Sequence, residues 1–336
     1  MNKYVEIKDI YKYYPVKRNN IFGKEKSYVH ACDSVSLSIN KGEILGVIGE
    51  SGCGKSTLGR VITRLEAPTK GDVFIKGQSS SDLIKEDAKK FHRMVQIVFQ
   101  NPYDAFTPRD TIRRIMLRPL KLHKIGKDNG ERLKIIKEAL SSGGLNPPEA
   151  FLERYPHQLS GGQLQRISII RAMLLKPGFI VADEPVSMLD VSVRADIINM
   201  LISLRNNYDT TMIFISHDIS LTRYISDKIA VMYLGRVVEY GDADEIVRNP
   251  QHPYTKVLIS NCATGDVRDS IEKLPILGEP PTPIDPPNRC YFYSRCFYRD
   301  ERCKNASYPD FERIGDSHFC ACHKVTSKSA TKEEKS

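Results

Sequence analysis

The chain has 336 residues, of which 40% are hydrophobic and 27% charged, and its formal net charge is +9. This length and composition favour a folded protein with a sizeable core and exclude a disordered or fibrous chain. No apolar run is long enough to span a membrane, and the first ten residues lack the basic-then-apolar order of a signal peptide. We therefore expect a cytosolic protein, in which cysteines stay reduced.

The first ten residues alternate polar and apolar side chains, which predicts an N-terminal strand. Short apolar runs predict further strands at residues 44–48, 95–99, 179–182, 212–215 and 229–233. Longer amphipathic segments, among them 133–140 and 193–204, separate these runs and predict helices. This alternation is typical of the α/β class, and residues 107–155 contain no convincing strand, which predicts a helical insertion.

Residues 49–57 read GESGCGKST and match G-x-x-x-x-G-K-[ST], the P-loop motif, between the strand predicted at 44–48 and an amphipathic run at 58–65. Glycines let successive backbone N–H groups curl around phosphate oxygens at a helix N-terminus. Lys55 is expected to reach the β- and γ-phosphates, and Ser56 to bind Mg²⁺. The alternative is a glycine-rich turn that binds nothing. The residues predicted to line the phosphate site are Gly49, Ser51, Gly52, Cys53, Gly54, Lys55, Ser56 and Thr57.

The strand predicted at 179–182 ends in Asp183 and Glu184. A carboxylate at the end of a buried strand is costly unless it serves a cation, and the Mg²⁺ of a P-loop nucleotide supplies that cation. Asp183 is therefore expected to help hold Mg²⁺, and Glu184 to polarise an attacking water. The alternative is an acidic turn without a ligand. Cys53, inside the P-loop, predicts that thiol reagents impair ATP binding.

A further group of motifs follows the P-loop in a fixed order: Gln100 after the strand at 95–99, the sequence LSGGQ at 159–163, SMLD at 187–190, and His217 after the strand at 212–215. With the P-loop and Asp183–Glu184, this order resembles that of the ABC-transporter ATPases over residues 3 to about 260. The resemblance implies a P-loop fold with a mixed sheet, a helical subdomain at about 104–160 and an N-terminal antiparallel β subdomain.

The resemblance also implies roles for single residues. Two ATPase domains would pack head to tail, so that the turn of one closes over the ATP of the other; the turn residues are Ser160, Gly161, Gly162 and Gln163. Gln100 would meet Mg²⁺ and the attacking water and couple to a membrane partner, and His217 would orient the γ-phosphate. An aromatic side chain should stack on adenine. Tyr14 matches the family position better than Tyr13. Met188 departs from the small residue usual there and puts the rate of one composite site in doubt.

Proline-rich sequence from 275 to 287 predicts a semi-rigid linker after a domain boundary near residue 262. We expect an ATPase domain at 1–262, an extension at 263–324 and a disordered tail at 325–336. The extension contains Cys290, Cys296, Cys303 and Cys322, whose spacing is not the paired C-x-x-C of many zinc sites. Four thiolates suit Zn²⁺ or an iron–sulfur cluster, and unligated cysteines are the alternative.

The sequence PQHPYT at 250–255, the proline-rich stretch and the cysteines ending in Cys322 together resemble the C-terminal extension of the oligopeptide/dipeptide importer ATPases, in particular their F-type subunit. The resemblance implies a [4Fe–4S] cluster at Cys290, Cys296, Cys303 and Cys322, with Zn²⁺ as the alternative metal and Cys320 as the alternative fourth ligand.

In that family the chain would hydrolyse ATP with Mg²⁺ to energise peptide import. Its expected partners are a D-type ATPase paralogue, two integral-membrane permeases and, indirectly, an extracytoplasmic peptide-binding protein, at the cytoplasmic face of the membrane. A nickel or other small-solute importer is the alternative within the family. A soluble ABC ATPase acting on nucleic acid and a non-catalytic iron–sulfur regulatory module are the alternatives outside it.

Overall fold

The computed structural model describes residues 3–16, 26–261, 274 and 277–325. They divide into two compact units, the first made of Met1–Tyr4, Asn40–Glu43 and Gln78–Ile213, and the second of Val5–Ile39, Ile44–Gly77 and Phe214–Ser336. The domain boundary expected near 262 and the tail beyond residue 325 lie outside the described residues. Among the described residues, no helix has both the length and the apolar character needed to cross a bilayer.

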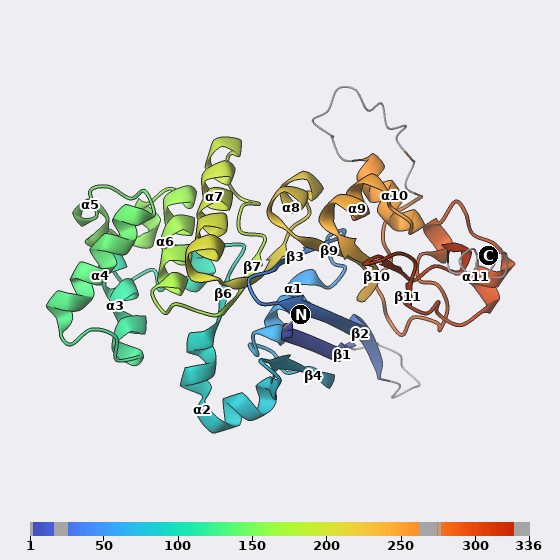
Figure 1. The fold of residues 1–336 in the computed structure, drawn as a ribbon, viewed down its shortest axis with the longest axis horizontal. Coiled ribbons are helices and arrows are strands. Elements are labelled where there is room, and N and C mark those ends of the chain that lie inside the picture. The colour runs from blue at the N-terminus through green and yellow to red at the C-terminus, as the bar shows by residue number, and fades with distance from the viewer. Residues whose placement is uncertain (1–2, 17–25, 262–273, 275–276, 326–336) are drawn as a thin grey trace, which may run out of the picture. The chain divides into compact units, whose positions relative to one another are not determined.

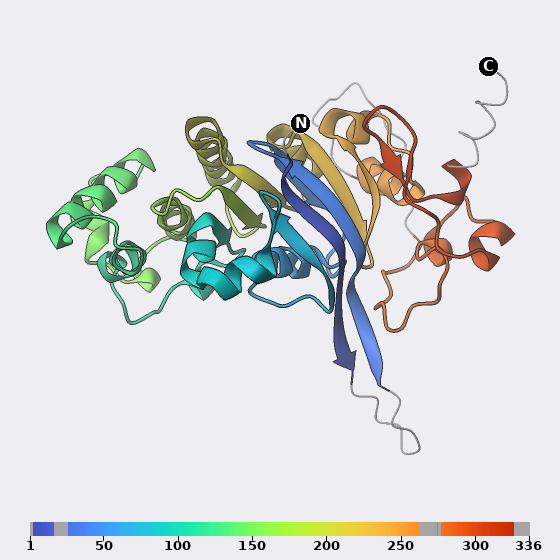
Figure 2. The same cartoon turned by 60° about the horizontal axis from the view of Figure 1, so that its bottom comes forward.

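The second unit is built on β-strands. The parallel pair β3 (Ile44–Ile48) and β9 (Lys228–Tyr233) continues through antiparallel β10 (Arg236–Asp242) to β12 (Phe319–Cys320) and β11 (Glu312–Arg313). This sheet is therefore mixed. A separate sheet joins β2 (Ser27–Asn40), β1 (Lys3–Val16) and β4 (Lys70–Ile75), with β1 antiparallel to β4. Figure 2 shows β1 and β2 running side by side in blue.

Short helices complete the second unit. They are α1 (Lys55–Ile62), α8 (Ile219–Ile225), α9 (Ala243–Arg248), α10 (Pro253–Ser260), the 3₁₀ turn η3 (Tyr293–Arg295) and α11 (Glu301–Asn305). One core cluster packs Tyr233 of β9 and Tyr254 of α10 against Phe292 and Cys296. Residues that follow the proline-rich stretch therefore share a core with β9 and α10.

The first unit contains the parallel pair β6 (Val95–Val98) and β7 (Phe179–Asp183), with the helices of the insertion between them in sequence. Its remaining elements are β5 (Gln78–Ser79), α2 (Ser80–Met94), η1 (Pro102–Ala105), α3 (Ile112–Leu122), α4 (Asn129–Ser142), α5 (Glu149–Leu152), η2 (Pro156–Gln158), α6 (Gly161–Met173), α7 (Val191–Tyr208) and the start of β8 (Thr211–Ile215). Figure 1 shows α3 to α6 grouped in green.

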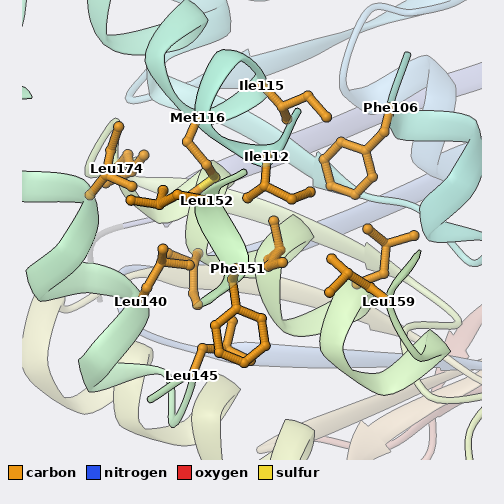
Figure 3. Packing of buried hydrophobic residues seen from close by; sticks show 14 of the residues in the cluster. Phe106, Ile112, Ile115, Met116, Leu140, Leu145, Phe151, Leu152, Leu159 and Leu174 are labelled. Carbon is orange, nitrogen blue, oxygen red and sulfur yellow. The ribbon is translucent and has the colours of Figure 1, made fainter. Parts of the chain in front are cut away.

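The insertion has its own hydrophobic core, in which Met116 of α3, Leu140 of α4 and Phe151 of α5 are buried (Figure 3). The cluster extends from Phe106 to Leu174, so α6 belongs to this core although the expected helical range ended at residue 160. Because α3, α4, α5 and α6 share this core, the start of α6 is held by packing against the other helices of the insertion.

The strands and helices named from the sequence are present, with shifted ends. Helix α1 begins at Lys55 and not at residue 58, since the P-loop leads directly into its first turn. Strand β1 continues to Val16, past an irregularity between Lys8 and Tyr11 where Asp9 has φ 45°. The break in register interrupts the alternation of polar and apolar residues, which is why the sequence pattern stops near residue 10.

Candidate nucleotide-binding site

The P-loop leaves the buried strand β3 and enters α1 through glycines with positive φ. Gly49 has φ 153°, and a Cβ there would lie 2.2 Å from the carbonyl oxygen of Met232. Gly54 has φ 105°, and its Cβ would lie 2.0 Å from the carbonyl oxygen of Ala31. No side chain other than hydrogen fits at these two positions, so the motif glycines are required by the fold as well as by a phosphate.

Lys55 is the first residue of α1 and is 5% exposed. Its Nζ donates hydrogen bonds to the carbonyl oxygens of Gly49, at 2.8 Å, and Glu50, at 3.0 Å. The ammonium therefore lies inside the curl of the loop. The N-cap of α1 is Gly54, which offers no side-chain cap, so the positive end of the helix dipole faces the same turn. Ser51 and Gly52 are exposed at the outside of this turn, and Ser56 and Thr57 are half-buried in α1.

Glu50, at a variable position of the motif, is held from three directions. Its N–H donates to Tyr254 Oη at 2.8 Å, and its carbonyl oxygen accepts from Lys55. Its carboxylate accepts two hydrogen bonds from Arg295, at 2.6 and 2.8 Å. The hydrogen bonds to Glu50 raise the pKa of the Arg295 guanidinium further above its ordinary value. The P-loop is thereby joined to α10 and to η3.

Cys53 is 3% exposed, and burial raises the pKa of its thiol. A protonated, buried thiol reacts slowly with alkylating reagents because the thiolate is the nucleophile. The sensitivity to thiol reagents expected from the sequence is therefore not supported by the placement of this side chain.

Tyr13 and Tyr14 differ in what covers their rings. Tyr13 stacks on His30, with ring centroids 3.9 Å apart, and its hydroxyl donates to Asp33 at 2.8 Å. One face of Tyr13 is thus already used in packing. The Tyr14 hydroxyl donates to Glu66, and burial with this hydrogen bond raises its pKa to about 12. Lys12 Nζ lies 5.0 Å from the centroid of the Tyr14 ring.

His217 lies in the loop between β8 and α8 and is exposed. The loop is fixed on both sides of it. Ser216 donates its N–H to Val47 of β3 at 3.1 Å, and Asp218 caps α8 by accepting from Leu221 N–H at 3.0 Å. Because Val47 lies two residues before Gly49, this loop begins at the strand end from which the P-loop departs.

In the first unit, Asp183 ends β7 and is 3% exposed, and Glu184 follows it in the left-handed region with φ 46°. A non-glycine residue in this conformation costs about 1–3 kcal/mol. Gln100 Nε2 donates to Glu184 Oε2 at 3.0 Å, and the N–H and hydroxyl of Ser187 both donate to the Glu184 carbonyl oxygen, at 3.2 and 3.1 Å. The hydrogen bond from Gln100 orients the Glu184 carboxylate, and the two from Ser187 hold its backbone.

The LSGGQ turn opens α6 with a capping box. Ser160 Oγ accepts from Gln163 N–H at 3.3 Å, and Gln163 Oε1 accepts from Ser160 N–H at 3.1 Å. Ser160 is exposed, and Gly161 and Gly162 are half-buried. A Cβ on Gly162 would lie 2.6 Å from Val193 Cγ1, so a larger residue here would have to displace the Val193 side chain of α7.

Met188 is 62% exposed. It lines a cavity of about 240 Å³ together with Gln100 and Gly161. Three sequence motifs of the first unit, those that contain Gln100, Gly161 and Met188, therefore contribute to the lining of one cavity.

Cys290, Cys296, Cys303 and Cys322 line one small cavity of the second unit, together with His323 and Lys324. Burial raises the pKa of Cys290 to about 12 and that of Cys296 to about 11. Cys320 is fully buried in β12 and does not line this cavity, so the geometry favours Cys322 over Cys320 as the fourth member of the set. None of the seven cysteines that the structure describes is in a disulfide; Cys262 lies outside the described residues.

No group of three or more His, Cys, Asp or Glu side chains in the described part of the chain is arranged to hold a metal ion. The four thiols thus share a cavity without forming a ready site for a single ion.

Sequence reasoning missed Glu50, Tyr254 and Arg295. Arg295 lies 245 residues from Glu50, and no spacing rule connects such distant positions. The available signal was weak: a charged residue inside the P-loop, and an arginine directly before Cys296.

Two family models match the chain. The model described as "ABC transporter" matches residues 32–187, and that described as "Oligopeptide/dipeptide transporter, C-terminal region" matches residues 238–303. The second match includes three of the four cysteines that line the common cavity.

Curated relatives match along nearly the whole length. The "Oligopeptide transport ATP-binding protein AppF" of Bacillus subtilis is 44% identical over 322 residues, covering 95% of this chain and 96% of the relative. The "Dipeptide transport ATP-binding protein DppF" of Escherichia coli is 44% identical over 320 residues, covering 94% of this chain and 93% of the relative.

Solved structures match the larger part of the chain. The dimeric ATP-binding cassette MJ0796 in a post-hydrolysis state with ADP and Pi is 32% identical, with a TM-score of 0.63, over 71% of this chain and 98% of that one. A second dimeric structure of MJ0796 has a TM-score of 0.62 at 31% identity.

Proposed function

This chain belongs to the ABC transporter family, and from that premise we propose that it is the ATP-hydrolysing subunit of an importer for oligopeptides or dipeptides. The observation that carries the proposal is the match over nearly the whole chain, including the C-terminal region, to ATP-binding proteins of oligopeptide and dipeptide transport. The P-loop geometry supports it, because Lys55 and the uncapped start of α1 face one glycine turn.

In the proposed reaction the P-loop binds the phosphates, and Tyr14 contacts the base. Ser56, Asp183 and Gln100 are the proposed Mg²⁺ ligands or ligands of its water shell, and the ion would neutralise charge on the phosphates. Glu184 orients and polarises the attacking water, and His217 contacts the γ-phosphate. The hydrogen bond from Gln100 and the strained backbone of Glu184 support a fixed role for this carboxylate.

Glu184→Gln tests this assignment. The variant should bind MgATP as the wild type does and lose hydrolysis about a hundredfold or more, because an amide cannot accept the water's proton. Phosphate release and ATP binding are measured in the assembled transporter. Glu138→Gln, an exposed substitution on α4, is the matched control and should leave both unchanged. Full hydrolysis by Glu184→Gln would overturn the role of Glu184.

The proposed partners are a second ATPase subunit of D type in head-to-tail contact, two integral-membrane permeases and, indirectly, an extracytoplasmic peptide-binding protein. The chain would lie at the cytoplasmic face of the membrane. Co-purification with permeases encoded by neighbouring genes tests this, and peptide uptake measured beside nickel uptake distinguishes the peptide importer from a nickel importer. Nickel uptake without peptide uptake would contradict the substrate proposal.

We also propose an iron–sulfur cluster, with Zn²⁺ as the alternative, at Cys290, Cys296, Cys303 and Cys322. Four thiols at one cavity are a donor set suited to either group. Iron, sulfide and zinc are quantified in anaerobically purified protein. Iron and sulfide in equal amounts support the cluster, and zinc alone supports the alternative. Protein that contains neither iron nor zinc would contradict the proposal. The division into an ATPase domain at 1–262 and an extension at 263–324 is part of the same proposal.

A further inference from the structure

Residues 290–296 form a short segment with a cysteine at each end. Cys290 and Cys296 both line the thiol cavity, and η3 lies between them. Arg295, the residue before Cys296, is 4% exposed, does not line that cavity, and donates to the carboxylate of Glu50 in the P-loop. The segment that contains both cysteines is therefore hydrogen-bonded to the P-loop through Arg295.

The Arg295–Glu50 contact is bidentate, with one guanidinium nitrogen on each carboxylate oxygen, at 2.6 and 2.8 Å. Arg295 also donates to the carbonyl oxygens of Leu277 and Gly278, both at 3.1 Å. A planar guanidinium with this many fixed acceptors has little freedom to rotate. The side chain is thus anchored in the extension and holds Glu50 from there.

The position of Glu50 bears directly on Lys55. The Glu50 carbonyl oxygen accepts from Lys55 Nζ at 3.0 Å, and Cys53 N–H also donates to this oxygen at 3.3 Å. A shift of Glu50 therefore changes the curl of the loop and the place of the ammonium that is to meet the phosphates.

We propose that Arg295 is a positioning residue for the P-loop, through which the cysteine-bearing segment 290–296 sets the affinity of the chain for MgATP. This inference rests on the proposed function, since it requires ATP as the ligand of the P-loop. It assigns the C-terminal extension a role in nucleotide binding.

A double-mutant cycle on the dissociation constant for MgATP tests the pair, using purified full-length chain and calorimetric titration. Arg295→Met and Glu50→Gln should each raise the dissociation constant about tenfold, and the double variant should be no weaker than the weaker single variant. Arg295→Lys, which keeps the charge and loses the fork, should fall between wild type and Arg295→Met. Effects that multiply in the double variant would show independent action and overturn the proposal.

Arg132→Met is the control for general loss of stability. Arg132 is a partly buried arginine of α4 that donates to the carbonyl oxygens of Ile125 and Gly126 at 2.9 and 2.8 Å. Its substitution should lower the unfolding midpoint while leaving the MgATP dissociation constant unchanged. If Arg132→Met weakens MgATP binding as much as Arg295→Met does, the effect is general destabilisation and the proposal is wrong.

Cys296→Ser tests the connection to the cysteines. In the wild-type background it should raise the MgATP dissociation constant several-fold, and in the Arg295→Met background it should add nothing. An equal effect in both backgrounds would overturn the connection. Failure of the wild-type chain to bind MgATP would instead contradict the proposed function, so the two failures are distinguishable.

Discussion

The P-loop and the LSGGQ turn are both glycine-containing turns that open a helix, and they satisfy that helix differently. The N-cap residue of α1 is Gly54, which supplies no side-chain cap, and the Lys55 ammonium donates to the carbonyl oxygens of the loop. The N-cap residue of α6 is Ser160, which forms a capping box with Gln163. The N-terminus of α1 therefore has no side-chain cap of its own, whereas the N-terminus of α6 is capped by side chains of the LSGGQ turn.

The difference gives the two turns separate tasks in the proposed reaction. An uncapped helix start surrounded by backbone N–H groups binds an anion strongly. A capped start presents only a weaker, exposed hydroxyl, which suits a surface that meets phosphate when a second subunit closes. Substitutions in the P-loop should therefore affect binding, and substitutions in the LSGGQ turn should affect turnover.

The largest contrast is expected between alanines in the two turns. Gly54→Ala forces a side chain into φ 105° and against the Ala31 carbonyl oxygen 2.0 Å away, and should cost about 2–4 kcal/mol of unfolding free energy and most MgATP binding. Gly162→Ala meets only the Val193 side chain and should cost about 1 kcal/mol with MgATP affinity kept. Urea denaturation and calorimetric titration measure both quantities. Equal loss of affinity in the two variants would contradict the contrast.

Ser160 separates capping from phosphate contact. Ser160→Ala removes the cap and should cost about 1 kcal/mol of stability. Ser160→Asp keeps a good cap, so stability should hold, but its negative charge should repel phosphate and lower turnover of the assembled transporter about tenfold or more. Thermal unfolding and phosphate release are compared. A Ser160→Asp transporter with normal turnover would exclude phosphate contact at this turn.

The adjacent tyrosines Tyr13 and Tyr14 are expected to differ in their contribution to MgATP affinity. Tyr14→Ala should weaken MgATP binding about fivefold, the size of one aromatic stacking contact. Tyr13→Ala should lower the unfolding midpoint, because it removes the stack on His30 and the hydrogen bond to Asp33, with a smaller change in affinity. The reverse order of affinities would assign base contact to Tyr13.

The Cys53 prediction concerns the reactivity of a buried thiol, and no change in MgATP affinity is expected from it. Its raised pKa keeps the folded thiol protonated at pH 8, so alkylation by iodoacetamide should be at least about tenfold slower than in the urea-unfolded chain. As pH rises above the ordinary thiol value, only the unfolded chain loses this proton, so stability should fall there and be unaffected below it. Peptide mass spectrometry follows the label on Cys53. Rapid labelling of the folded chain would contradict its burial.

Several elements were predictable because short-range spacing encodes them. The apolar run at 44–48 followed by the P-loop gave strand β3 and the start of α1, and the apolar run before Asp183 gave β7. Strands β11 and β12 were not predicted, since two-residue strands carry no periodicity and form only where β10 offers an edge. The capping box of α6 lay in the sequence as Ser160 and Gln163, three residues apart.

By itself, the sequence determined the order of the motifs, the glycines that the P-loop requires and the family resemblance, because each depends on neighbours within a few residues. The tertiary structure decided that Tyr13 stacks on His30, that Cys322 and not Cys320 lines the cavity of the other thiols, and that Arg295 holds Glu50. These outcomes join segments far apart in the chain, and packing, which spacing does not encode, selects them.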